Sequence, residues 1–258
     1  MSSRPLLVFD FDGVIVDGMD EYWWSARQAC LHLIGASGED NPWPETVPDA
    51  FLRLRPWVHH GWEMVLLAAE LQRADSQLLR QGVDRVAASY SKFCQRSLDF
   101  WGWCPEQLQQ ALEEARRQAL MTDRDEWLAR HRPFPGVVER LRAMPLEGTD
   151  WAVLTTKGTE FTAELLNSFQ LSPRRLYGHE AGSKPEVLLQ LAAECPLRGF
   201  VEDRRATLER VLVTPGLQGL RCYLVSWGYI RPEDTQDLPS GICLLDQDAL
   251  ATPLAAWP

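Results

Sequence analysis

The pattern of apolar and polar positions divides the chain into two kinds of region. Short apolar runs bounded by turn residues are typical of buried parallel strands. Helical periodicity occupies most of the intervals between them, and strands that alternate with helices indicate a parallel sheet. The sequence therefore predicts an α/β fold with a doubly wound, Rossmann-like sheet. The expected strands lie at 6–9, 151–155, 176–178, 199–203, 221–226 and 242–245, and the helices at 137–143, 160–169, 185–194 and 206–213.

The region 17–132 has a different pattern, with helical periodicity and hardly any strand-like run. The first two strands are about 140 residues apart, whereas a strand-helix-strand unit takes roughly 30. We therefore expect an α/β core domain at 1–16 and 133–258 and an inserted all-helical domain at 17–132. A break rich in Gly, Pro, Asp and Asn occupies 35–48. The expected helices of the insert lie at 18–33, 51–71, 75–100, 105–121 and 123–131.

Asp17 precedes the first helix of the insert, and Asp20 follows three residues later. Acids at this position are typical of helix starts, where they bind free amides and interact favourably with the helix dipole. We expect Asp17 to cap the helix, and we prefer this role to a catalytic one.

Composition narrows the classes of partner. The 258 residues are 45% hydrophobic, and the formal charge is −10 with a pI near 5.0. Such a balance disfavours a nucleic-acid or anionic-membrane partner, because no broad basic surface would neutralise phosphates. A small phosphorylated ligand is still compatible, since a metal ion and one or two lysines make a local positive site. The oligomeric state is left open.

Two features of the sequence indicate the cellular compartment in which we expect the protein. No apolar run approaches the roughly 18 residues of a membrane span, and the short start leaves no room for a signal peptide. The cysteines form no Cys-x-x-Cys pair, so we interpret them as reduced thiols of a cytoplasmic protein. These six residues are Cys30, Cys94, Cys104, Cys195, Cys222 and Cys243.

The first candidate functional residues lie at the end of the first strand, where Asp10 and Asp12 precede Gly13. A strand fixes the first carboxylate, and the turn that Gly13 permits re-aims the second. This suits a nucleophile and an acid/base partner acting on one ligand. Taken alone, two acids after a strand are also typical of an ordinary polar loop.

Three further polar residues lie at the ends of elements. Thr155 and Asp203 each close an apolar strand, and Lys184 opens a helix within Gly182-Ser183-Lys184-Pro185. In a doubly wound sheet, ligands bind outside the carboxyl ends of the strands. Each residue alone has a plain structural explanation, but their order along the chain favours one shared site.

The stretch Asp10-Phe11-Asp12-Gly13-Val14, followed by Thr155, Lys184 and Asp203, resembles the four motifs of the haloacid dehalogenase-like hydrolases. This superfamily is dominated by phosphatases. The resemblance covers 4–16 and 133–245. Within the superfamily, the chain is similar to the branch that contains the phosphoglycolate phosphatases and β-phosphoglucomutases. It implies the same α/β core with an inserted helical cap.

The resemblance also implies a role for each residue. Asp10 would attack phosphorus and form an aspartyl-phosphate, and Asp12 would protonate the leaving oxygen and then activate water. Because dehalogenases of this family lack an acid at the second position, Asp12 favours phosphoryl transfer. Asp10, Asp203 and the backbone carbonyl of Asp12 would hold Mg²⁺. The implied phosphate-binding residues are Gly13, Thr155, Thr156 and Lys184.

The sequence departs from the family pattern at two positions. Relatives commonly carry a second acid three to five residues after the position of Asp203, and no acid occurs at 204–208. Glu202 is a possible substitute from the other side. Thr156 stands where relatives often carry Asn. Both departures affect the expected metal affinity.

The insert contributes the candidates for substrate contact. Eight of the eleven tryptophans lie in or beside it, and we favour packing over an aromatic platform for a sugar or base. Arg27, Arg53 and Arg55 are candidates for binding a substrate carboxylate or second phosphate. We expect His59 and His60 to be structural, because adjacent residues of a helix point in different directions.

These inferences predict a Mg²⁺-dependent phosphatase that hydrolyses a small phosphorylated metabolite through an aspartyl-phosphate. Two alternatives stay open. A phosphomutase would use the same residues and return the phosphoryl group to a substrate oxygen. A non-catalytic phosphate-binding or regulatory protein would retain a relict site.

Overall fold

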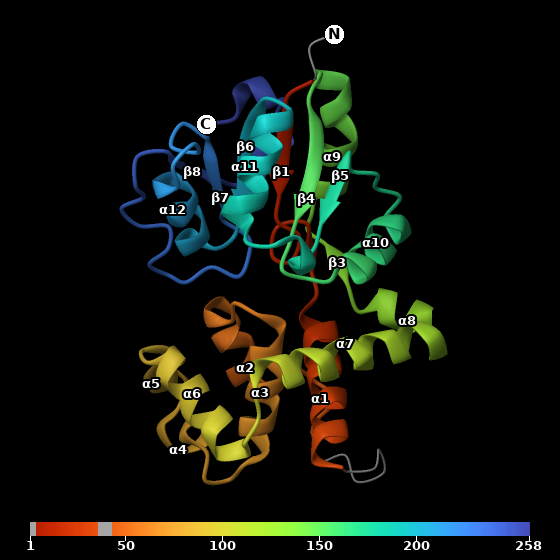
Figure 1. Cartoon of the computed structure of the whole chain (residues 1–258), viewed down its shortest axis with the longest axis vertical. Coiled ribbons are helices and arrows are strands. Elements are labelled where there is room, and N and C mark those ends of the chain that lie inside the picture. The colour runs from red at the N-terminus through yellow and green to blue at the C-terminus, as the bar shows by residue number, and fades with distance from the viewer. Residues whose placement is uncertain (1–3, 36–42) are drawn as a thin grey trace. The chain divides into compact units, whose positions relative to one another are not determined.

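The computed structural model describes residues 4–35 and 43–258, and these form two compact units (Figure 1). The core unit contains the chain up to Asp17 together with Arg132–Pro258, and the helical unit is Gly18–His131. Part of the expected break at 35–48 lies outside the described residues. Each unit is described by itself below.

The core unit is built on a six-stranded sheet in which every pairing is parallel. The order is β5-β4-β1-β6-β7-β8, so β1 lies between the two strands that carry the later motifs. The predicted fold class is confirmed. The strands are β1 (Leu6–Phe9), β4 (Asp150–Leu154), β5 (Arg175–Tyr177), β6 (Leu197–Glu202), β7 (Cys222–Val225) and β8 (Ile242–Leu245).

Helices cover the sheet because alternate strand residues are apolar on both faces. One face packs Val8, Ala152 and Phe200 against α11 and α12, through Val187 and Leu208 among others. The intervening residues of these strands are buried as well, as expected for a sheet covered on both faces. The helices are α9 (Val137–Ala143), α10 (Thr159–Ser168), α11 (Lys184–Glu194), α12 (Arg205–Val213) and α13 (Gln247–Ala251). Short 3₁₀ turns occupy Met144–Glu147, His179–Ala181 and Leu254–Ala256.

The chain passes between the units through two short strands, β2 (Val16–Asp17) and β3 (Arg132–Pro133), which pair antiparallel. We call them the crossing pair. The pattern analysis did not predict them. Gly18 is the N-cap residue of the first helix, and the expected capping role of the Asp17 side chain stays a prediction. The Asp17 carboxylate accepts a hydrogen bond from the Tyr229 hydroxyl at 2.6 Å.

The helical unit contains more helix breaks than periodicity indicates. The expected helix 51–71 is interrupted at Val58–His60, where the His60 backbone is extended. The expected helix 75–100 is interrupted at Gly82, whose φ of +80° does not fit a helix. The helices are α1 (Met19–Ile34), α2 (Asp49–Leu54), α3 (Gly61–Gln72), α4 (Gln77–Gln81), α5 (Val83–Ala87), α6 (Tyr90–Trp101), α7 (Pro105–Thr122) and α8 (Arg124–Ala129), with a 3₁₀ turn at Arg55–Trp57.

The first of these breaks also corrects the placement of His59 and His60. They lie ahead of α3 rather than on a helix, and their rings contact each other with centroids 4.2 Å apart. The argument that adjacent helical residues diverge does not apply to them. The backbone N–H of His59 donates to Glu63 at 2.9 Å.

Several tryptophans pack inside the helical unit. Trp23, Trp43 and Trp127 are at most 5% exposed. The indole of Trp43 donates to the Ala68 carbonyl at 2.8 Å, and that of Trp127 donates to Glu21 at 3.3 Å. For these three, burial with a satisfied indole N–H indicates a packing role. Within the described residues, no helix combines the length and the apolar character needed to cross a membrane.

Candidate active site

Asp10 occupies the centre of the sheet edge where the strands end. It directly follows β1, its backbone N–H donates to the Val201 carbonyl of β6 at 2.8 Å, and its side chain is buried. On the other side of β1, Phe9 pairs with Val153 of β4, whose strand leads into Thr155. Parallel pairing therefore brings three motif positions to one edge, although they are far apart in sequence.

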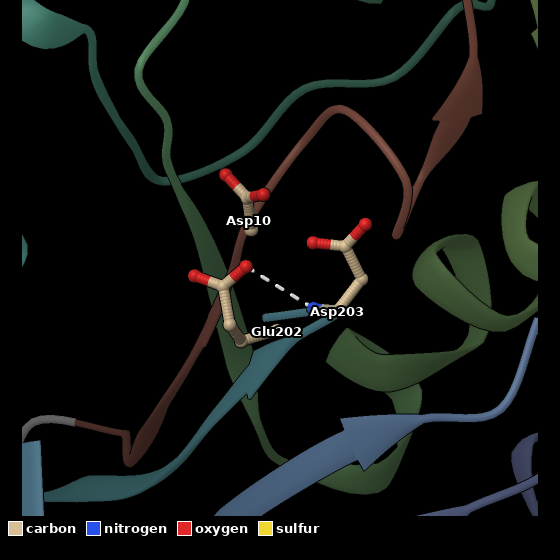
Figure 2. Close-up of side chains that lie close together, drawn as sticks. All are labelled: Asp10, Glu202 and Asp203. Atoms are coloured by element: carbon tan, nitrogen blue, oxygen red, sulfur yellow. Dashed lines mark hydrogen bonds between the residues drawn. The ribbon is translucent and has the colours of Figure 1, made fainter. Parts of the chain in front are cut away.

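Two further acids lie beside Asp10 at the end of β6. Oxygens of Asp10, Glu202 and Asp203 lie within 4.8 Å of one another, and all three residues are buried (Figure 2). Glu202 is held in place because one of its oxygens accepts from the backbone N–H groups of Asp203 (3.1 Å) and Arg204 (3.2 Å). The acid that sequence analysis offered as a substitute is thus part of the cluster.

Lys184 reaches this cluster from the first residue of α11. Its Nζ lies 2.8 Å from Asp10 Oδ1 and 2.7 Å from Glu202 Oε2. The helix start is fixed by a capping box between Ser183 and Glu186. A well-defined helix start therefore places the ammonium between two carboxylates.

The cluster has more negative charge than its one ammonium balances. Burial and the neighbouring Glu202 together raise the pKa of Asp10 to about 7, against the lowering effect of Lys184. Burial also raises the pKa of Glu202. Burial lowers the pKa of Lys184, but Asp10 and Glu202 outweigh this effect, so that pKa is raised and the group stays charged.

The donor set fits a small divalent cation. Three carboxylates supply the hard oxygen ligands that Mg²⁺ prefers, and their excess negative charge is what a dication would neutralise. Within the described part of the chain, this is the one group of His, Cys, Asp or Glu side chains with suitable spacing for a metal. Asp10 and Asp203 were expected as ligands, and Glu202, the expected substitute, lies in the same group; their role as ligands stays a prediction.

Asp12 is paired with a lysine that sequence analysis missed. Lys157 Nζ lies 3.3 Å from Asp12 Oδ1, and the lysine side chain is only 1% exposed. The backbone N–H of Lys157 donates to the Thr155 hydroxyl at 3.1 Å, which links the lysine to the threonine that ends β4. The available signal was a lysine two residues after a strand-end threonine. Thr156 lies in the same turn and is half-buried.

The surroundings of position 13 leave no room for a side chain, so only glycine fits there. Its φ is +89°, and a Cβ at this position would lie 1.9 Å from Asp203 Oδ2. A side chain would therefore displace the carboxylate, and the left-handed backbone disfavours one as well. The close approach makes the turn after β1 part of the acidic cluster.

The loop after β7 is a second contact that sequence analysis missed. The backbone N–H of Tyr229 donates to Asp203 Oδ2 at 2.9 Å, and the indole of Trp227 donates to the Val14 carbonyl at 3.1 Å. This loop carries no motif, so no local pattern singled it out.

The three arginines of the helical unit have different surroundings. Arg27 is buried, donates to the Pro44 carbonyl at 2.8 Å and lies over the Trp23 ring. Arg53 is exposed and pairs with Asp84 at 2.6 Å. Arg55 lies over the Tyr22 ring, 5.1 Å from its centroid. Arg27 and Arg53 therefore have local structural partners.

The structure thus brings Asp10, Lys184, Glu202 and Asp203 together and packs Gly13 against them. Asp12 and Thr155 are joined to the same edge through Lys157. The chemical roles of these residues and of Thr156 stay predictions.

Comparison with known proteins extends the resemblance over nearly the whole chain, although no family model matches. A curated phosphoglycolate phosphatase from Pseudomonas fluorescens is 23% identical over 234 residues, which are 87% of this chain and 70% of that protein. A structure described as a predicted phosphatase from Clostridium acetobutylicum is 14% identical, with a TM-score of 0.58 and 97% of each chain covered. A haloacid dehalogenase-like family hydrolase from Streptococcus pneumoniae is 13% identical, with a TM-score of 0.51 and 95% of each chain covered. The resemblance predicted from the four motifs is confirmed, and the chain has the fold of these hydrolases.

Proposed function

We propose that this chain is a haloacid dehalogenase-like phosphatase that hydrolyses the phosphoric monoester of a small metabolite. The similarity to phosphatases supports an enzyme of this class. The observation that carries the proposal is the position of Asp10 at the centre of the sheet edge, in contact with Lys184 and beside two further acids. The name of the curated relative makes phosphoglycolate the first substrate to test.

In the first step, a carboxylate oxygen of Asp10 attacks phosphorus and the ester P–O bond breaks. Asp12 donates its proton to the leaving oxygen, so that the alcohol departs neutral. The product on the protein is an aspartyl-phosphate. Lys184, Thr155, Thr156 and the Gly13 amide bind the phosphoryl oxygens during this transfer.

In the second step, water attacks the phosphorus of the aspartyl-phosphate. Asp12, now a carboxylate, accepts a proton from that water, and the bond from phosphorus to Asp10 breaks. Inorganic phosphate leaves, and both carboxyl groups return to their starting states. The Lys157 ammonium at 3.3 Å from Asp12 orients its carboxylate for both proton transfers.

We propose that Asp10, Asp203 and the Asp12 carbonyl hold Mg²⁺, with Glu202 as a supporting carboxylate. When bound, the ion neutralises charge on the phosphate and on the acids. The raised pKa of Asp10 supports this assignment, because the nucleophile must be ionised and the protein alone leaves it partly protonated near pH 7.

The helical unit is proposed to act as a cap that excludes water and selects the substrate, as the resemblance implies. We also propose a cytoplasmic location. All six cysteines are free, as expected for a protein in a reducing compartment.

The proposed function is tested by incubating the purified full chain with a panel of phosphorylated metabolites, with Mg²⁺ or with EDTA. We expect Mg²⁺-dependent release of inorganic phosphate from one or a few small esters. The Asp12→Asn variant is the control for contaminating phosphatases, and it should release little phosphate. Isomer formation from a hexose phosphate without phosphate release would instead identify a phosphomutase. Ligand binding with no turnover of any ester would identify a relict site.

A further inference from the structure

The loop after β7 contacts two carboxylates that lie in different parts of the core unit. The backbone N–H of Tyr229 donates to Asp203 Oδ2 at 2.9 Å, and its hydroxyl donates to Asp17 Oδ1 at 2.6 Å. Asp203 belongs to the acidic cluster, and Asp17 belongs to the crossing pair. One residue therefore connects the cluster to the strand by which the chain leaves the core unit.

The neighbours of Tyr229 fix the position of this loop. The indole N–H of Trp227 donates to the Val14 carbonyl at 3.1 Å. A Cβ added to Gly228 would lie 2.4 Å from both the Asp203 Cβ and the Gly13 carbonyl oxygen, so the loop backbone packs directly on both. Because contacts this close leave no space, the loop cannot move without moving Asp203 and the turn after β1.

Both of these hydrogen bonds of Tyr229 have a carboxylate acceptor, and such bonds are shorter and stronger than neutral ones. Their lengths of 2.9 Å and 2.6 Å lie in the usual ranges for N–H and O–H donors. Removal of the hydroxyl would therefore release the loop from Asp17 while leaving the N–H that orients Asp203. The two contacts can be separated by one substitution.

We propose that Tyr229 is a positioning residue that couples metal binding at Asp203 to the conformation of the crossing pair. Its hydroxyl holds the loop on Asp17, and the loop in turn holds the Asp203 carboxylate in its binding orientation. Because such coupling is reciprocal, a metal bound at Asp203 also stabilises the crossing pair. This inference rests on the proposed function only for the identity of Asp203 as a metal ligand.

The test measures Mg²⁺ binding to the full chain by calorimetry, without substrate, and hydrogen exchange of the amides in β2 and β3. In the wild type, Mg²⁺ should slow this exchange. In Tyr229→Phe, we expect Mg²⁺ affinity to fall about 3- to 10-fold, as for the loss of one hydrogen bond. The effect of Mg²⁺ on exchange in the crossing pair should be reduced.

Matched variants separate coupling from general loss of structure. Tyr223→Phe removes a hydroxyl from a buried tyrosine of β7 whose ring packs on Trp257, and it should bind Mg²⁺ like the wild type. Asp17→Asn retains an acceptor oxygen and should keep most of the affinity, whereas Asp17→Ala should match Tyr229→Phe. The double variant Asp17→Ala/Tyr229→Phe should bind no more weakly than either single variant.

The inference is overturned if Tyr229→Phe binds Mg²⁺ with wild-type affinity and shows the wild-type change in exchange. It is also overturned if the two single variants weaken binding additively. A chain that hydrolyses no ester but shows the coupling would contradict the proposed function and support this inference. A chain that binds no Mg²⁺ would contradict both.

Discussion

The two units differ in how their buried carboxylates are compensated by neighbouring groups. In the helical unit, Glu21 is fully buried but saturated with partners: Arg116 donates to both its oxygens at 2.7 and 2.9 Å, and Ser25 and Trp127 donate as well. In the core unit, Asp10 and Glu202 share the ammonium of Lys184, and the carboxylate of Asp203 lies beside theirs.

This difference indicates a structural role for Glu21 and a ligand-binding role for the acidic cluster. An acid saturated with donors is stabilised where it lies and has no capacity for a ligand. Acids that crowd together with too few cations raise the free energy of the folded state, and a bound metal ion can relieve this repulsion. The crowding of several carboxylates around one ammonium, rather than burial itself, distinguishes this cluster from Glu21.

The largest expected effect follows from removing the proposed nucleophile. Asp10→Asn should lower kcat by at least about 10³-fold, because the amide oxygen cannot form the aspartyl-phosphate. The thermal unfolding midpoint should stay unchanged or rise, since one of the crowded negative charges is gone. Phosphate release in Mg²⁺ and calorimetry test both expectations. Full turnover by the variant would refute the nucleophilic role.

Substitution of Glu21 should have the opposite pattern to Asp10→Asn, because it should reduce the stability of the fold. Glu21→Ala should lower the free energy of unfolding of the helical unit by about 3–5 kcal/mol, because it leaves Arg116 buried without its carboxylate. Urea unfolding followed by tryptophan fluorescence measures the loss. The double variant Glu21→Leu/Arg116→Met, which replaces both charges with apolar groups, should recover most of the stability. Equal stability of Glu21→Ala and the wild type would show that the pair is not structural.

The pH dependence of the metal-free core should follow Asp10. Its pKa of about 7 in the folded protein lies above the ordinary 3.8, so the folded state keeps a proton that the unfolded chain releases. The stabilisation is complete below about pH 4 and is lost as pH rises to about 7. In EDTA, the urea midpoint should therefore fall over this range, and Asp10→Asn should remove that part of the slope. An identical slope in the variant would assign the titration to another group.

A smaller effect is expected from Lys157, which contacts Asp12, the proposed acid/base residue. Lys157→Met should lower kcat about 10- to 100-fold with little change in KM, because Asp12 loses the cation that orients its carboxylate. Lys157→Arg should recover part of the activity. Steady-state kinetics on the best substrate of the panel decides this. A change in KM alone would place Lys157 in substrate binding instead.

The sequence predicted the core unit better than the helical unit for a physical reason. Buried parallel strands are continuous apolar runs, and 242–245 and the helix 137–143 match the observed bounds. In the helical unit, apolar periodicity continues across the breaks at His60 and Gly82, so two long helices were predicted where there are several. Gly82 was a usable signal, because glycine often ends a helix.

The site was predicted where residues close a strand or open a helix, and missed where the chain folds back. Asp10, Lys184 and Asp203 could be selected by their positions in the elements. Lys157 had only a weak local signal, two residues after a strand-end threonine, and Tyr229 had none, because their contacts with Asp12 and Asp17 join residues 145 and 212 positions apart. Such contacts depend on loop geometry that no local pattern encodes.

The antiparallel crossing pair has a consequence for how this architecture can be varied. Since Asp17 and Arg132 are register partners, the chain leaves and re-enters the core at adjacent points. A two-residue hairpin turn is sufficient to join such strands. The stretch Gly18–His131 is therefore a cassette: a helical segment of another size or shape can replace it without changing the register of the sheet. Under the proposed function, exchange of this one segment would change the substrate range while the proposed phosphate chemistry of the core stays constant.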